Sequence, residues 1–217
     1  HVSSGKYIFL YFKNVFFKIK ITNKMSLKIP LKSLSKEEKN MIGKKLSFAK
    51  KQTKYNQFQP REYVRPYSFD NDENVYIPFH FGQKMLEQNY RRERSEFRKM
   101  NTKFSGKLRS LQQTVKKEAL QLLNNQGCCL ISLYTGAGKT ITSIFLATKI
   151  GLPCLIVVHR LILIKQWKDS IEKVCKDPKI QILTAKSELK DNMDFYIINA
   201  INATKKNFDT FSCIGTL

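Results

Sequence analysis

The sequence predicts an α/β fold in which a parallel sheet carries helices, and two observations indicate it. First, an apolar run rich in β-forming residues at 128–133 ends at a glycine-rich turn, and an amphipathic stretch follows at once. Second, strand-like apolar runs return further along the chain, at 154–158, 180–183 and 194–200. Strands that alternate with helices pair in parallel through crossovers, so these segments are expected to form one sheet.

The turn after the first strand is the most specific motif in the chain. Between that strand and the helix expected at 140–150 it reads Thr135, Gly136, Ala137, Gly138, Lys139 and Thr140. Small residues let consecutive backbone N–H groups surround phosphate oxygens, and a helix amino terminus attracts anions. Lys139 is expected to reach the β- and γ-phosphates, and the Thr140 hydroxyl to complete the coordination of Mg²⁺. The motif predicts a nucleotide-binding P-loop; the alternative is a glycine turn that binds nothing.

Composition and charge restrict the class of protein. The 217 residues are 42% hydrophobic, enough for a real core, which excludes a disordered chain. The 39 basic and 17 acidic residues give a net charge of +22, which favours a polyanionic partner such as DNA or RNA. Part of this bias also follows from the Lys-, Asn-, Ile-, Phe- and Tyr-rich composition that AT-rich codons produce, so the charge is supporting evidence only.

The five cysteines show no metal-binding or disulfide pattern. They include no Cys-x-x-Cys pair and no histidine at ligand spacing, and they stand at 128, 129, 154, 175 and 213. The interpretation is buried free thiols in an intracellular, reducing compartment. Structural zinc and disulfides are the alternatives.

The first residues differ from the rest of the chain. The sequence opens on His1, and Tyr, Phe, Ile, Lys and Asn occupy 16 of the first 24 positions before Met25. Residues 1–24 are therefore predicted to be a non-native or untranslated leader. A signal peptide at 7–17 is the alternative, although lysines interrupt the apolar run well short of the ~20 residues that a membrane span needs. No membrane partner is expected.

Residues 25–74 are predicted to form a basic, mainly helical extension and linker. Ser35 followed by Glu37 and Glu38 indicates a helix start, with a helix near 35–50. A loop is expected at 70–74 and a short strand at 75–79. Residues 83–101 have helical composition and open a run of basic residues at 91, 92, 94, 98, 99, 103, 107 and 109. That run is either a solvated face or a contact with nucleic-acid phosphates.

A helix expected from 108 to 124 carries a second motif. Leu108-Arg109-x-x-Gln112, about twenty-five residues before Lys139, resembles the adenine-recognition element of superfamily 2 helicases. A glutamine amide can donate to and accept from the edge of adenine. The P-loop resembles the first motif of this superfamily, A-x-x-G-x-G-K-T, with Leu133 in place of the usual alanine. The resemblance implies ATP as the nucleotide, bound by Arg109, Gln112 and the P-loop residues.

Further motifs follow the later strands. Residues 154–158 precede His159 and Arg160, and an apolar helix then holds Gln166-Trp167, which is similar to motif Ia of the superfamily. The resemblance implies that His159 and Arg160 meet a nucleic-acid phosphate. Trp167 is expected to pack in the core, with base stacking as the alternative.

The strands at 180–183 and 194–200 end near two more candidate contacts. Thr184 follows the first of them, and Asn199 stands at the end of the second, where the superfamily has motif Ib. The resemblance implies that Thr184 and Asn199 touch the bound nucleic-acid strand. Loops at a sheet edge without such a role are the alternative for both.

The resemblance also implies a domain organisation. Residues 75–217 are interpreted as the first RecA-like ATP-binding domain of a superfamily 2 helicase, truncated before the Walker B strand and missing a second RecA-like domain in cis. Three stretches of sequence resemble helicases of large nucleocytoplasmic DNA viruses, which are related to the poxvirus transcript-release helicase: 133–140, 159–167 and 194–202. A virion or the host cytoplasm would then be the location.

The function implied is ATP hydrolysis coupled to movement on DNA or RNA, with Lys139 and Thr140 as the catalytic residues present. This fragment alone is expected to be inactive, because the catalytic acids and the arginine finger are not among its residues. Two alternatives remain: a nucleic-acid-binding module without ATPase activity, and a P-loop ATPase or kinase outside the helicases.

Overall fold

The computed structural model describes residues 6–12, 26–50, 52, 58–70, 73–78, 81–82, 84, 98–126, 128–203 and 213–216. The chain divides into two compact units. The larger unit comprises residues 1–15 and 92–217, and the smaller unit comprises residues 16–91. Each is described by itself below.

The larger unit is built on a six-stranded sheet in the order β11-β12-β9-β13-β1-β8. The strands are β11 (Ile180–Leu183), β12 (Phe195–Asn199), β9 (Cys154–Val158), β13 (Cys213–Thr216), β1 (Lys6–Phe12) and β8 (Cys128–Leu133). The first four pair in parallel, which confirms the predicted sheet. β1 lies antiparallel to both β13 and β8, so β8 runs in the same direction as the parallel strands. Residues 6–12, within the predicted leader, thus form a strand of this sheet.

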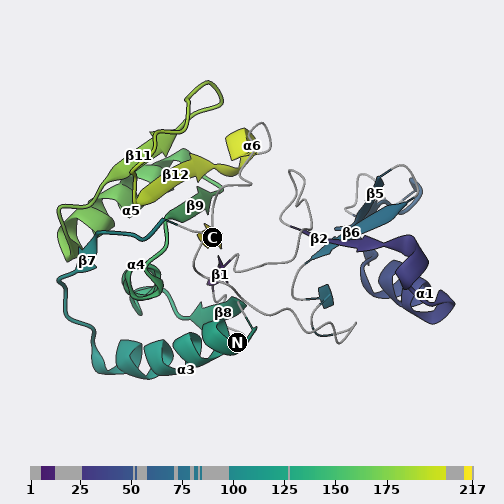
Figure 1. The fold of residues 1–217 in the computed structure, drawn as a ribbon, viewed down its shortest axis with the longest axis horizontal. Helices are drawn as coiled ribbons and strands as arrows, with labels where there is room; N and C mark the ends of the chain where they lie inside the picture. The colour runs from purple at the N-terminus through teal and green to yellow at the C-terminus, as the bar shows by residue number, and fades with distance from the viewer. Residues whose placement is uncertain are drawn as a thin grey trace. The chain divides into compact units, whose positions relative to one another are not determined.

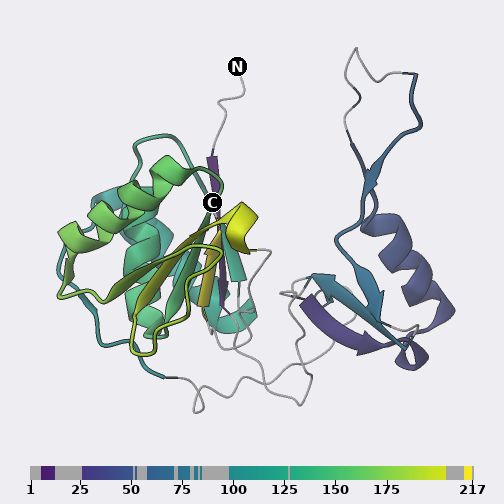
Figure 2. The ribbon, with the colours of Figure 1, turned by 90° about the horizontal axis from the view of Figure 1, so that it is seen from above.

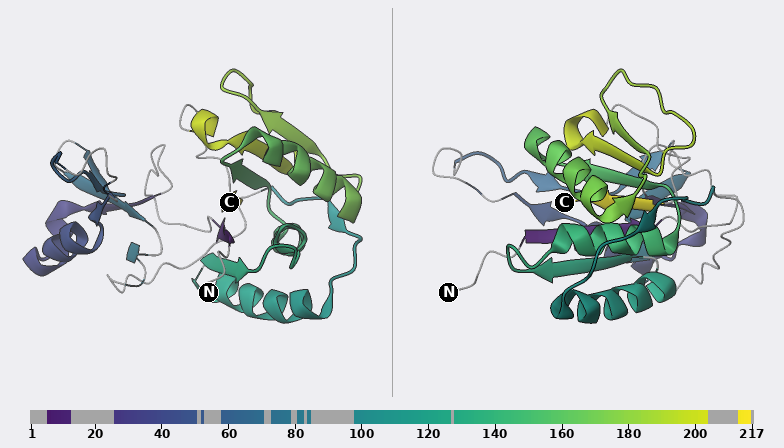
Figure 3. Two further views of the ribbon diagram at one scale, coloured as in Figure 1. Left: turned by 180° about the vertical axis from the view of Figure 1, so that it is seen from behind. Right: turned by 90° about the vertical axis from the view of Figure 1, so that its left-hand side faces the viewer.

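Three helices cover one face of this sheet: α3 (Ser110–Gln126), α4 (Lys139–Ile150) and α5 (Leu161–Val174) (Figure 1). The α/β class is thereby confirmed, and the three helices match those expected at 108–124, at 140–150 and after Arg160. Figure 3 shows α4 and α5 beside the strands from which they follow. A four-residue helix, α6 (Ala200–Ala203), follows β12.

The neighbouring strands β9 and β12 bury both of their faces, as central parallel strands do. Along β9, Cys154, Ile156 and Val158 pack in the cluster under the helices, whereas Leu155 and Val157 belong to a second cluster on the opposite face. Trp167 of α5 lies in the first cluster and is only 4% exposed, so its prediction as a core residue is confirmed.

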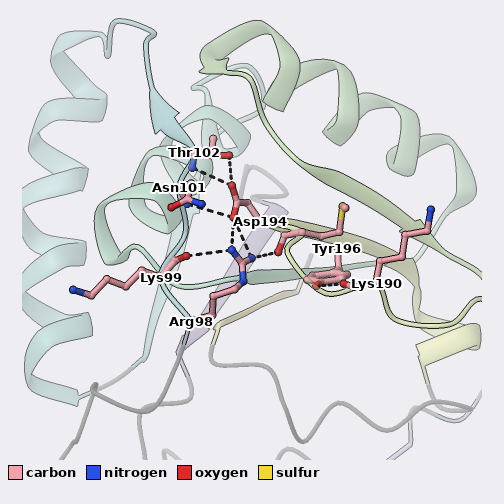
Figure 4. A network of polar contacts seen from close by, with 8 residues as sticks. Arg98, Lys99, Asn101, Thr102, Lys190, Asp194 and Tyr196 are labelled. Atoms are coloured by element: carbon pink, nitrogen blue, oxygen red, sulfur yellow. Dashed lines mark hydrogen bonds and ion pairs between the residues drawn. The ribbon is translucent and has the colours of Figure 1, made fainter.

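A buried carboxylate fastens the segment before α3 to the sheet. Asp194, 1% exposed, stands just before β12 and accepts hydrogen bonds from the Arg98 guanidinium at 3.1 Å, from the Thr102 N–H at 3.0 Å and from the Thr102 hydroxyl at 2.6 Å (Figure 4). Arg98 also donates to the carbonyl of Met193. Residues 98–102 have no regular secondary structure, so the helix expected at 83–101 does not include them; residues 85–97 lie outside the described residues. Tyr196 stands beside this network, and burial raises the pKa of its phenol.

Two further strands complete the described part of the larger unit. The short strands β7 (Lys103–Phe104) and β10 (Cys175–Lys176) pair antiparallel. Burial raises the pKa of the Cys175 thiol to about 11, and Cys129 and Cys154 are also buried free thiols. These three cysteines confirm the predicted buried thiols; the side chains of the other two lie outside the description.

The described part of the smaller unit includes a three-stranded antiparallel sheet and helix α1. The sheet has the order β2-β6-β5, formed by β2 (Ser26–Pro30), β6 (Asn74–Pro78) and β5 (Ser68–Asp70). The single turn η1 (Leu31–Ser33) precedes α1 (Lys36–Lys45), whose capping box joins Ser35 and Glu38 as the sequence predicted. Ile29, Ile42 and Ile77 are among its buried core.

Two expectations for this region were wrong. The extension is not mainly helical, because its described residues form five strands beside one α-helix. The predicted boundary at residue 75 cuts strand β6, which pairs with β2 on one side and β5 on the other and so belongs to the smaller unit. The short strand predicted at 75–79 is confirmed as β6, although one of its two partners, β2, is distant in sequence.

An acid-sensitive group lies at the edge of this sheet. The Asp70 carboxylate accepts hydrogen bonds from the Tyr76 hydroxyl at 2.7 Å and from the Asn74 amide at 2.8 Å, and it lies 3.1 Å from the Lys28 ammonium. These donors lower the pKa of Asp70 to about 2, the Tyr76 hydrogen bond contributing most.

In the described part of the chain, no helix has the length and hydrophobicity to cross a membrane.

Candidate nucleotide-binding site

The P-loop connects β8 to α4 through a turn with two left-handed glycines. Gly136 has φ 86° and Gly138 has φ 87°, values that side-chain-bearing residues rarely adopt. Gly138 is also the N-cap residue of α4, which begins at Lys139. The structure therefore confirms the predicted order of strand, glycine turn and helix.

Lys139 lies folded over its own loop. Its ammonium donates hydrogen bonds to the carbonyls of Leu133 at 2.7 Å and Tyr134 at 3.0 Å. Thr140 is half-buried beside it at the start of α4, while Thr135 and Gly136 are exposed and Ala137 is buried. An exposed loop backbone, a cation and a hydroxyl are thus gathered at one helix amino terminus, which suits a phosphate group with a bound cation.

Gln112 of α3 is tied directly to the P-loop. It is 2% exposed, its amide nitrogen donates to the Gly138 carbonyl at 3.1 Å, and its amide oxygen accepts from the Arg109 N–H at 2.8 Å. The Gly138 carbonyl also accepts from both the N–H and the hydroxyl of Thr142, at 3.0 Å and 3.1 Å. A Cβ atom at Gly138 would collide with the Gln112 amide. The structure thus brings Gln112 to the P-loop and the Arg109 backbone to Gln112; the binding of nucleotide by Arg109 and the reading of adenine by Gln112 stay predictions.

Thr142 is a residue of this site that the sequence analysis missed. It is fully buried and lies one turn into α4. Its signal in the sequence is the spacing of four residues from Gly138, because a helical threonine can donate to the carbonyl four positions earlier.

The predicted nucleic-acid contacts lie at the same edge of the sheet. His159 and Arg160 follow β9, Thr184 follows β11 and Asn199 ends β12. β8 runs in the same direction as these strands, so the P-loop shares this edge, where ligands bind in open α/β sheets.

The four residues differ in what their side chains do. His159 and Arg160 are exposed. Asn199 is 5% exposed and its amide oxygen accepts from the Ile201 N–H at 3.0 Å, whereas the Thr184 hydroxyl lies 2.8 Å from that of Ser187. The structure therefore leaves His159 and Arg160 exposed and engages Asn199 and Thr184 in local turns; contact of all four with nucleic acid stays a prediction.

Apolar side chains also stand exposed along this edge, a feature that the sequence analysis did not identify. Tyr134 is 62% exposed after β8, Leu161 is 70% and Ile162 is 61% exposed after β9, and Ile201 is 71% exposed after β12. Their signal is an apolar residue within four positions of the end of a strand. Within the described residues, no group of His, Cys, Asp and Glu could hold a metal ion.

Comparison with known proteins agrees with this geometry. Residues 105–212 match the family described as the res subunit of type III restriction enzymes. "Putative helicase 161L" of Invertebrate iridescent virus 6 is 37% identical over 155 residues, which cover 67% of this chain and 34% of that protein. "Putative helicase 109L" of Invertebrate iridescent virus 3 is 38% identical over 157 residues, which cover 64% of this chain and 46% of that protein.

A third relative, "Putative helicase 055L" of Frog virus 3, is 30% identical over 112 residues, covering 49% of this chain and 24% of that protein. The matched part of the chain thus spans 24% to 46% of the length of these viral relatives. The matched family supports a helicase-like ATPase in general terms. Through residues 105–212, which hold the P-loop and the strands that follow it, this chain matches the type III restriction enzyme res subunit family, and its relatives are viral proteins named as putative helicases.

Proposed function

We propose that the protein is an ATP-driven motor that moves along DNA or RNA. The observation that carries the proposal is the shared edge of the sheet, where the P-loop and the exposed His159 and Arg160 lie in one helicase-family unit. A nucleotide bound at the P-loop and a nucleic acid bound beside it would both contact the carboxyl ends of the β-strands. Binding of one ligand could therefore change the affinity for the other.

The residues present fit Mg²⁺ and ATP. The two left-handed glycines open the loop backbone to phosphate oxygens, and the Thr140 hydroxyl at the helix start is a hard oxygen donor of the kind that Mg²⁺ prefers. When bound, Mg²⁺ would neutralise charge on the β- and γ-phosphates. Lys139 would exchange its two carbonyl acceptors for phosphate oxygens, and Gln112 would hold the loop backbone in place.

The proposal assigns hydrolysis to the whole motor. In it, a second RecA-like domain in cis would supply the arginine finger, and catalytic acids that are not among residues 1–217 would bind Mg²⁺ and position the attacking water. This chain by itself is then expected to bind ATP weakly and to hydrolyse it little or not at all. Turnover by the purified chain that disappears on Lys139→Ala would overturn this assignment.

The experiment that tests the proposal measures coupling between the two ligands. A labelled single-stranded oligonucleotide is titrated with the chain, without nucleotide and with a non-hydrolysable ATP analogue plus Mg²⁺. The analogue is expected to change the oligonucleotide affinity by about fivefold or more, as allosteric couplings commonly do, and Lys139→Ala is expected to abolish the change.

Two results would favour other functions. Steep salt dependence of oligonucleotide binding with no effect of the ATP analogue would identify a nucleic-acid-binding module with an idle P-loop. Nucleotide turnover that is indifferent to DNA and RNA would identify a P-loop ATPase outside the helicases. Either result contradicts a nucleic-acid motor.

A further inference from the structure

A two-stranded ribbon extends from the smaller unit. It pairs β3 (Phe48–Ala49) with β4 (Tyr63–Val64), with Phe48 opposite Val64 and Ala49 opposite Tyr63. The pairing continues in the hydrogen bond from the Lys50 N–H to the Glu62 carbonyl at 2.8 Å. In Figure 2 the ribbon extends beyond α1 and the three-stranded sheet of its unit. We name residues 48–65 the ribbon segment.

Both faces of the ribbon are exposed. Phe48 is 53% exposed, and the neighbouring Tyr63 and Val64 are each 48% exposed. Successive side chains of a strand point to opposite faces, so both faces of β4 carry a side chain that is about half exposed. Phe58, at the described end of the loop, is 93% exposed. An isolated two-stranded ribbon is marginally stable in water, and exposed apolar groups of this kind mark interaction sites.

The ribbon segment is also strongly basic. Its eighteen residues contain five lysines and arginines and one acidic residue, with four aromatic residues interleaved among them. The acidic residue, Glu62, forms an ion pair with Lys50 that lowers the pKa of the Glu62 carboxyl. Arg61 and Arg65 are exposed, and the Arg65 guanidinium lies 5.6 Å from the centre of the Tyr63 ring. Positive charge and flat aromatic surface are therefore presented together.

We propose that the ribbon segment binds single-stranded nucleic acid, with bases stacked on Phe58 and Tyr63 and phosphates contacted by Arg61 and Arg65. Charge complementarity selects a polyanion, and exposed rings select one whose bases are unstacked. Neither contact requires a 2′-hydroxyl, so DNA and RNA strands are bound alike. This contact uses none of the residues of the P-loop edge and lies outside residues 105–212 in sequence, so it goes beyond the proposed motor activity.

The test measures binding of fluorescent oligothymidine and oligouridine of about 16 nucleotides to the whole chain, without nucleotide. Phe58→Ala and Tyr63→Ala are each expected to weaken binding of both strands by about fivefold or more, the usual loss for a stacked base. Phe69→Ala is the matched control, because Phe69 is 53% exposed in β5 of the same unit but outside the ribbon segment. Its affinity is expected to stay within about twofold of the wild type.

Two further comparisons isolate the ribbon. Arg65→Ala is expected to reduce the slope of log affinity against log salt by about 0.7, the value for one contact to a single strand. Repeating the Phe58→Ala comparison in an Arg160→Ala chain separates the ribbon from the strand edge. The loss is expected to be of the same size in both backgrounds, because the proposed ribbon contact does not use Arg160 and contacts that share no residues contribute independently.

Three results would overturn the proposal: wild-type affinity in both Phe58→Ala and Tyr63→Ala, an equal loss in Phe69→Ala, or tighter binding of a duplex that Phe58→Ala does not change. An equal loss in Phe69→Ala would indicate a nonspecific effect, and tighter binding of a duplex would indicate a groove contact. Far-ultraviolet circular dichroism checks that each variant folds, and the exposure of these side chains makes misfolding unexpected. The ribbon test uses no nucleotide, so its outcome does not depend on whether an ATP analogue changes the oligonucleotide affinity. Failure of the ribbon proposal would likewise leave the proposed motor function untouched.

Discussion

Gly136 and Gly138 provide a matched test of the link between α3 and the P-loop. Both have left-handed backbones, so alanine at either position costs roughly 1–2 kcal/mol of backbone strain. A Cβ at Gly136 meets nothing within 4 Å, whereas a Cβ at Gly138 collides with the Gln112 amide. Overpacking of this kind adds about 1–3 kcal/mol, so Gly138→Ala is expected to be less stable than Gly136→Ala by that amount.

Urea unfolding followed by tryptophan fluorescence measures this difference. The chain has one tryptophan, and Trp167 is buried in the larger unit, so the signal reports on the unit that contains the P-loop. The double variant Gly138→Ala/Gln112→Ala is expected to recover part of the loss, because truncating the glutamine removes the collision. Equal midpoints for the two glycine variants, or strictly additive losses in the double variant, would refute the close approach of Gln112 to the loop.

Three other predictions concern separate parts of the structure. Gln112→Ala is expected to weaken binding of both inorganic triphosphate and ATP in calorimetric titrations, because Gln112 holds the P-loop backbone. Gln113→Ala, the control, is expected to bind both as the wild type does. A loss confined to ATP would show that Gln112 contacts only the base. Asp194→Ala is expected to lower the free energy of unfolding of the larger unit in urea by about 2–4 kcal/mol, because buried hydrogen-bond donors are left unpaired. Asp191→Ala, at an exposed position, is expected to lower it by less than about 0.5 kcal/mol. Similar urea midpoints for the two variants would contradict this. The Asp70 carboxylate, with its pKa lowered to about 2, stabilises the smaller unit above about pH 4 and loses this effect as the pH falls toward 2. The stability gap between wild type and Asp70→Asn, followed by circular dichroism in urea, is therefore expected to close over that range, and a constant gap would contradict the pairing.

Local patterns in the sequence were enough to predict the elements around the P-loop. The apolar run before Thr135 and the glycines at 136 and 138 fix a strand, a turn and a helix within a few residues of one another. The Ser35 and Glu38 capping box is equally local, and it correctly placed the start of α1. Such signals need no knowledge of what packs against them.

What the sequence analysis missed depends on pairs far apart in the chain. Gln112 contacts Gly138 across 26 residues, and helical spacing alone does not say that its amide turns toward the loop. Arg98 and Asp194 are 96 residues apart, and neither has a neighbour in sequence that predicts an ion pair. The sheet of the smaller unit was not predicted for the same reason, because its strands are short and β2 pairs with β6, which lies more than forty residues later in the sequence.

The central claim is that the turn after β8 is a working ATP site. Calorimetric titration of the chain with Mg²⁺ and ATP tests it most directly, with Lys139→Ala and exposed Lys149→Ala as the paired variants; Lys149 stands in the last turn of the same helix. The account predicts saturable binding that is lost in Lys139→Ala and kept in Lys149→Ala. No binding by the wild type, or binding that survives Lys139→Ala, would contradict it.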